Sequence, residues 1–200
     1  MKPPPIPDAL IIPIITRHPI ESPPISGRLS RDVGMSQLRR IGDVVVAWAK
    51  LENSLNDLIW TVEGNTLETG RSATEDLHIS SLLTALQNAM QRHLVGDKFK
   101  PERKAILNII NFVNEVKDER NMVVHGTWAT FNGVPIVGSL RAATQEKTKV
   151  TFESYPADRM RDIRDFAILG IRNVTALIDR IEALRGIRLP QSVAFHNHPK

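Results

Sequence analysis

Residues 101–137 read PERKAILNIINFVNEVKDERNMVVHGTWATFNGVPIV. Apolar residues in the first two thirds of this stretch recur at three- and four-residue steps, which predicts an amphipathic α-helix over residues 101–124. Proline at the start is typical of a first helical turn, and Gly126 is expected to end the helix. The stretch therefore predicts a long helix that stops abruptly after a histidine.

The period of the sequence changes after Gly126. Two short apolar runs, residues 127–131 and 134–137, flank Asn132-Gly133, which is a strong signal for a two-residue hairpin turn. Residues 149–153 have the composition of a third strand. We expect a small antiparallel hairpin or meander to follow the helix.

Working outward, three further helices are expected at residues 36–62, 74–94 and 157–184, and each is followed two positions later by a glycine. The inward positions expected on the first helix are Ile41, Val45, Trp48, Leu55 and Ile59, and those on the third are Ile106, Ile109, Ile110, Val113 and Val124. The predicted fold class is mainly α: a four-helix arrangement with a small antiparallel hairpin or meander between the third and fourth helices.

Composition sets the domain boundaries. Residues 1–33 are rich in proline and isoleucine, which favours either an extended arm or a disordered leader, and residues 188–200 read as a flexible tail. Residues 34–187 are left as one helical domain. The apolar runs of the leader are too short and too often interrupted by proline to span a bilayer. Because the chain has no cysteine, we expect a cytoplasmic protein. Because no apolar run is long enough to span a bilayer, we expect no membrane partner.

Two charged residues fall on apolar helix faces. Arg120 lies near the middle of the inward face of the third helix, and Glu52 occupies the same kind of position on the first. An unpaired charge in either place would cost several kcal/mol or more, so we expect the two side chains to pair. Such a pair either fixes the register of the two helices or holds the guanidinium in place for a ligand.

His125 follows Arg120 by five residues and Asn121 by four. Asn121 and His125 share a helix face, whereas Arg120 and His125 are about 140° apart around an ideal helix. One copy therefore cannot easily bring both side chains to one phosphate, but two copies related by a two-fold axis can. The C-terminal end of the helix also favours a protonated imidazole.

Arg120, Asn121 and His125 form an Arg-Asn-x3-His motif that resembles the HEPN superfamily (higher eukaryotes and prokaryotes nucleotide-binding domains). Trp48-x-x-x-Glu52 is similar to the acidic position usual on the first helix of that family. The resemblance implies a helical domain over residues 34–187 and a homodimer whose two motifs form one composite site.

The resemblance also implies a metal-independent endoribonuclease without a cofactor, in a toxin–antitoxin, phage-defence or RNA-processing role. Arg120 would stabilise the scissile phosphate, His125 would move protons, Asn121 would orient His125 or the phosphate, and Glu52 would support Arg120. RNA is the implied substrate, and an antitoxin or a nucleotidyltransferase-like protein is a possible partner. The alternative is a non-catalytic helical dimer that binds RNA, a nucleotide or a protein.

Three more residues are weaker candidates for binding RNA. Trp128 stands beside the motif and either stacks on a base or packs the hairpin onto the helices. Arg161 and Arg164 belong to a run of alternating charges that opens the last helix. The first interpretation of that run is a solvent-exposed helix face with local ion pairs. The second is a surface that contacts the RNA backbone.

Overall fold

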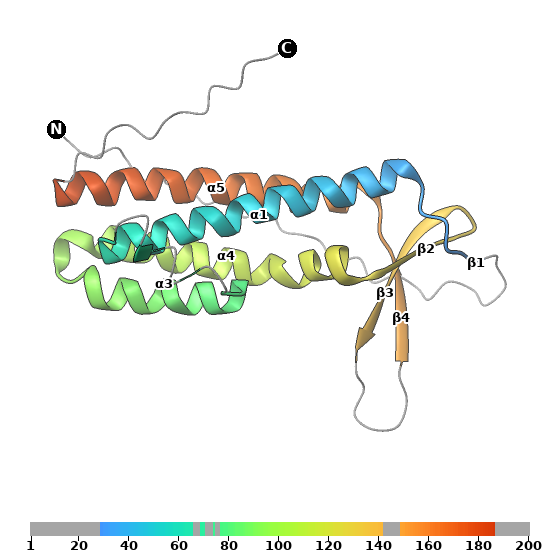
Figure 1. Ribbon diagram of the computed structural model, residues 1–200, viewed down its shortest axis with the longest axis horizontal. Coiled ribbons are helices and arrows are strands. Elements are labelled where there is room, and N and C mark those ends of the chain that lie inside the picture. Colours follow the sequence, from blue (N-terminus) through green and yellow to red (C-terminus); the bar gives the residue numbers. More distant parts are fainter. Residues whose placement is uncertain (1–28, 66–68, 71–73, 75–76, 142–148, 187–200) are drawn as a thin grey trace, which may run out of the picture. The chain divides into compact units, whose positions relative to one another are not determined.

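The computed structural model describes residues 29–65, 69–70, 74, 77–141 and 149–186. This part of the chain is mainly helical, with four long α-helices labelled in Figure 1. They are α1 Met35–Glu63, α3 Ile79–His93, α4 Lys100–His125 and α5 Ala157–Arg185, with a 3-10 turn at Asp97–Phe99 before α4. The predicted fold class is confirmed: four helices, with a small antiparallel sheet between the third and the fourth.

The sheet has four strands in the order β1-β2-β3-β4, all antiparallel, namely β1 Leu29–Ser30, β2 Thr127–Phe131, β3 Val134–Arg141 and β4 Lys149–Ser154. Asn132 and Gly133 both have positive φ, 48° and 79°. Positive φ at both central positions belongs to the type I′ turn, whose twist matches that of the flanking strands. The predicted hairpin and third strand are confirmed.

Strand β1 was not expected, because it lies within the segment predicted as an arm or leader. Leu29 pairs with Phe131 and Ser30 pairs with Thr130. The rest of that segment, residues 1–28, and the predicted tail, residues 188–200, lie outside the described residues.

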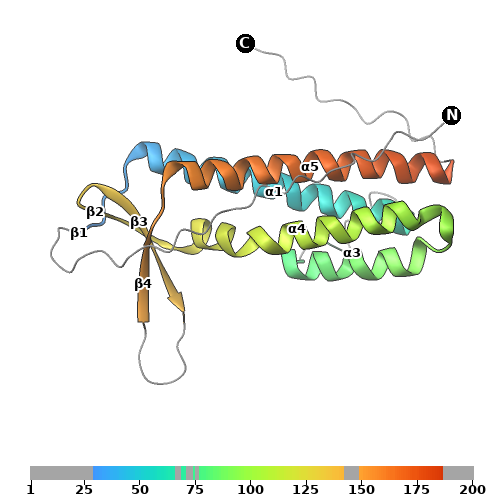
Figure 2. The ribbon, with the colours of Figure 1, turned by 180° about the vertical axis from the view of Figure 1, so that it is seen from behind.

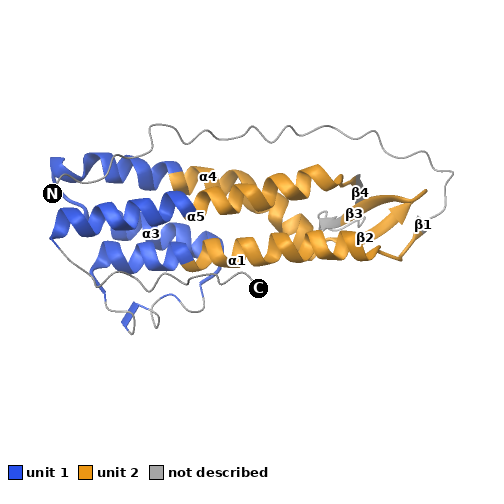
Figure 3. Cartoon of the chain, turned by 90° about the horizontal axis from the view of Figure 1, so that it is seen from above, with its two compact units in different colours: residues 1–10, 54–108, 172–200 blue, residues 11–53, 109–171 orange. Residues whose placement is uncertain are grey.

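The described chain divides into two compact units, which are coloured separately in Figure 3. Unit 1 contains residues 54–108 and 172–186, and unit 2 contains residues 29–53 and 109–171. Helices α1, α4 and α5 contribute residues to both units. Within the described ranges, no helix combines the length and the apolar content needed to cross a bilayer.

In unit 1 the apolar face of α3 is buried. The unit also contains the last part of α1, the first part of α4 and the last part of α5. The face is the one predicted: Ile79, Leu82, Leu83, Leu86, Met90 and the following Leu94 are all buried. The helix begins at Ile79 and not near Thr74, because His78 has extended φ and ψ angles. Thr74 instead accepts a hydrogen bond from Trp60 Nε1 at 3.0 Å.

Polar contacts also hold unit 1 together. The Arg180 guanidinium pairs with the fully buried Glu102. Arg185 donates to the carbonyls of Thr61 and Val62 at 2.6 and 2.5 Å and so caps the end of α1. Burial lowers the pKa of the Arg185 guanidinium below its ordinary value.

Unit 2 packs the first part of α1, the last part of α4 and the first part of α5. The rings of Phe112 and Phe166 stack with centroids 3.5 Å apart, which joins α4 to α5. Gly170 of α5 lies against Leu51, where a Cβ atom would come within 2.9 Å of a leucine methyl. In Figures 1 and 2 the strands lie at the end of this unit where α1 and α5 begin and α4 ends.

Two predicted inward positions are wrong by one residue. Val45 is 39% exposed and its neighbour Val44 is fully buried. Val124 is only half-buried, whereas Val123 is fully buried. In runs of consecutive valines the sequence does not fix which residue faces the core, and packing against the neighbouring elements decides it.

Candidate functional site

The expected pairing of Glu52 with Arg120 is confirmed. Arg120 Nη2 lies 3.6 Å from Glu52 Oε1, so the pair joins α4 to α1 within unit 2. The two side chains are 19% and 29% exposed, which makes the pair half-buried and open to solvent on one side. The guanidinium also lies over the Trp48 ring, 5.9 Å from its centroid. Arg120 is therefore held from two directions by α1.

Asn121 contacts Arg120. Its Oδ1 atom accepts a hydrogen bond from Arg120 Nη1 at 3.0 Å, so the amide helps to orient the arginine. Arg120 Nε is buried without a hydrogen-bond partner among the described residues. A buried donor of this kind is costly, and an anion or a water molecule would satisfy it. The guanidinium is thus positioned while part of its donor capacity remains unused.

His125 is the last residue of α4 and is exposed. Gly126 follows it because the chain must approach the sheet closely: a Cβ atom there would lie 2.2 Å from Val137 Cγ2 and 2.4 Å from the Met122 carbonyl oxygen. Ideal helix geometry places His125 about 7.5 Å further along the axis than Arg120 and about 140° around it. One copy thus offers a fixed cation and an accessible imidazole on different sides of one helix end.

A second ion pair beside the motif was missed by the sequence analysis. Glu119 is buried and accepts hydrogen bonds from Tyr155 Oη at 2.9 Å and from Arg159 Nη2 at 2.5 Å. The Arg159 guanidinium also lies 4.5 Å from the centroid of the Tyr155 ring. Helical spacing was the signal available, because Glu119 stands three residues after Val116 and four before Val123, and both valines are buried.

The weaker candidates are placed as follows. Trp128 Nε1 donates to the Val123 carbonyl at 2.9 Å, and the indole meets the Tyr155 ring edge-on at 5.5 Å. These contacts favour the packing interpretation over base stacking. Arg161 pairs with Asp158, and Arg164 pairs with Asp165 at 2.7 Å. These are the local ion pairs expected of an exposed helix face with alternating charges. Both arginines also line a groove at the start of α5.

Unit 2 thus places Arg120 in contact with both Glu52 and Asn121 near the end of α4 and leaves His125 accessible beyond them. Such an arrangement can bind an oxyanion through a fixed guanidinium and exchange a proton through an imidazole. Within the described ranges, no three acidic or histidine side chains group closely enough to hold a metal ion. No family model, curated protein or solved structure matches this chain.

Proposed function

We propose that this protein is a metal-independent endoribonuclease of the HEPN type, acting as a homodimer with a composite arginine–histidine site. The observation that carries the proposal is the guanidinium of Arg120, which Glu52 and Asn121 hold in one orientation at the helix end that exposes His125. Positioned charge of this kind stabilises a transition state without reorganisation during the reaction.

The reaction that fits these groups is transesterification by the RNA itself. The ribose 2′-oxygen attacks phosphorus, the bond from phosphorus to the 5′-oxygen breaks, and a 2′,3′-cyclic phosphate and a 5′-hydroxyl result. One His125 imidazole takes the proton from the 2′-hydroxyl, and the protonated His125 of the second copy gives one to the leaving oxygen. Arg120 binds the non-bridging oxygens, on which negative charge develops.

An apolar stripe on α1 supports the dimer. Met35, Leu38 and Val45 are 80%, 47% and 39% exposed. Together with Gly42 and Ala49 they recur at alternating steps of three and four residues, which is the spacing of a helix–helix seam. The next position in this series is Glu52. A second copy packed along the stripe would therefore meet the Glu52–Arg120 pair, as a composite site requires.

The experiment is cleavage of a labelled single-stranded RNA by purified protein in excess EDTA. The wild-type protein should cut, and Arg120→Ala and His125→Ala should each lower the rate at least 100-fold, the scale expected when one electrostatic or acid–base group is removed. The product should carry a 2′,3′-cyclic phosphate, and an RNA with 2′-O-methyl groups should resist cleavage. Undiminished cutting by both variants would refute the proposal.

A mixing experiment tests the composite site separately. Wild-type chains exchanged with an excess of His125→Ala chains form heterodimers that hold only one of the two histidines, so the activity should fall with the square of the wild-type fraction and not in proportion to it. Val45→Glu in the middle of the α1 stripe should give a monomer that keeps its helical content and does not cut. A monomer with full activity would exclude the two-chain site. Protein that folds, binds RNA and never cuts would favour the non-catalytic alternative.

A further inference from the structure

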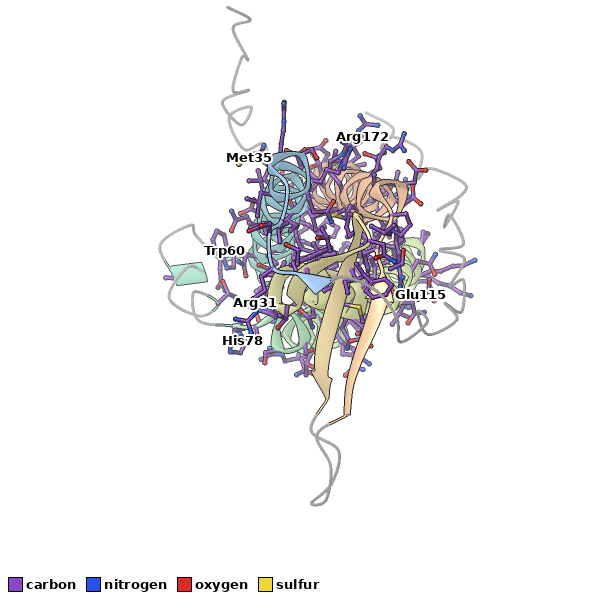
Figure 4. All side chains as sticks on the ribbon, turned by 90° about the vertical axis from the view of Figure 1, so that its right-hand side faces the viewer. Arg31, Met35, Trp60, His78, Glu115 and Arg172 are labelled. Atoms are coloured by element: carbon purple, nitrogen blue, oxygen red, sulfur yellow. The ribbon has the colours of Figure 1, made fainter. Side chains whose placement is uncertain are left out.

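An open groove of about 890 Å³ lies in unit 2, lined by residues from the first turns of α1 and α5. The charged residues that line it are Arg39, Arg40, Asp43, Asp158, Arg161 and Arg164. Gln37 is buried and donates to Met160 Sδ at 3.6 Å, which ties the two helix starts together. Figure 4 faces this end of the unit and labels Met35.

The groove is positively charged. Its lining includes four arginines and two aspartates, a difference of two positive charges. Asp158 is paired with Arg161, and Arg164 is paired with Asp165, which does not line the groove. Arg39 and Arg40 are exposed and have no ion pair within the described ranges. The two helix starts add the positive ends of their dipoles.

We propose that this groove binds the sugar–phosphate backbone of single-stranded RNA. The choice of RNA rests on the proposed function. The guanidinium groups come from two helices and line an open groove instead of converging on one point, which suits the repeated charges of a strand better than one small anion.

The test measures binding with a fluorescent 2′-O-methyl oligonucleotide, which cannot be cut through its 2′-oxygen. Fluorescence anisotropy gives the dissociation constant of the full chain over a salt series. Each phosphate contact to a single strand contributes about −0.7 to the slope of log K against log salt. Arg39→Gln/Arg40→Gln should therefore flatten the slope by about 1.4 and weaken binding roughly 25-fold at 0.1 M salt.

The matched control is Lys104→Gln/Arg172→Gln, which removes the same charge from exposed positions of unit 1 outside the groove; Arg172 is labelled in Figure 4. It should leave the slope unchanged. Equal slopes for the groove variant and the wild-type protein would overturn the proposal, as would equal losses in the groove and control variants.

Binding and cleavage fail independently in this design. A groove variant that binds the probe weakly, together with a His125→Ala protein that still cuts RNA, would support the groove and refute the proposed site. A His125→Ala protein that binds normally but does not cut, together with a groove variant of normal affinity, would support the site and overturn the groove.

Discussion

Replacing Glu119 with glutamine tests whether the buried cluster beside the motif holds α4 in place. The carboxylate is 7% exposed and is shared by Tyr155 and Arg159, whose own side chain is 14% exposed. Glutamine keeps the shape but removes the negative charge that faces the Arg159 guanidinium. Removing one partner of a buried pair costs 3–5 kcal/mol, and we expect about 3 kcal/mol because Arg159 retains some contact with solvent.

The assay is urea unfolding followed by tryptophan fluorescence and far-UV circular dichroism. Trp128 meets the Tyr155 ring edge-on, so its emission reports on this region. With a urea dependence of about 2 kcal/mol per molar, a loss of 3 kcal/mol lowers the unfolding midpoint by about 1.5 M. Tyr155→Phe removes the hydroxyl that donates to the carboxylate and should lower the free energy of unfolding by about 1.5 kcal/mol.

Asp118→Asn is the matched control, because it removes the same charge from the preceding, exposed residue of the same helix. A surface substitution of this kind changes the free energy of unfolding by about 0.5 kcal/mol or less. If Glu119→Gln destabilises the protein no more than Asp118→Asn does, the cluster does not hold α4 and the reasoning is refuted.

Two further predictions concern the ends of the helices. Gly126→Ala should lower the free energy of unfolding by about 2 kcal/mol in the same urea assay, since its Cβ would overlap Val137 and a backbone carbonyl. No loss of stability in Gly126→Ala would contradict the close approach of this backbone to β3. Arg185→Gln should lower the free energy of unfolding by about 1.5 kcal/mol, because it removes the donors that cap α1. The exposed Arg172→Gln is the control and should leave that free energy unchanged. Equal effects of the two substitutions would exclude the cap.

The features that the sequence predicts well are those set by neighbouring residues. Asn132-Gly133 determines its own turn, because both residues adopt the positive φ that a type I′ turn requires. Gly186, also with positive φ, ends α5 close to the predicted residue. The pairing of Glu52 with Arg120 was predictable as well, since each charge interrupts an apolar face and pairing relieves the cost.

Features that depend on distant residues were not predictable from local patterns. Strand β1 is two residues long and is defined only by its pairing with β2, about a hundred positions later in the chain. The Glu119 cluster needs Tyr155 and Arg159, which β4 and the start of α5 bring to it. The hydrogen bond from Arg120 to Asn121 Oδ1 joins adjacent residues, and the sequence alone did not indicate it. Local spacing gives the possible partners, and tertiary packing chooses among them.

The two ion pairs at the end of α4 together determine where His125 emerges. Glu119 and Arg120 are adjacent, so their side chains leave the helix about 100° apart, one toward the start of α5 and the other toward α1. Rotation of α4 in either direction would break both pairs. Partly buried ion pairs contribute little net stability, but they exclude arrangements that leave a charge unpaired. We infer that these two ion pairs fix the direction in which the exposed His125 imidazole points. Glu119→Gln should therefore reduce RNA cleavage even at temperatures where the variant is fully folded.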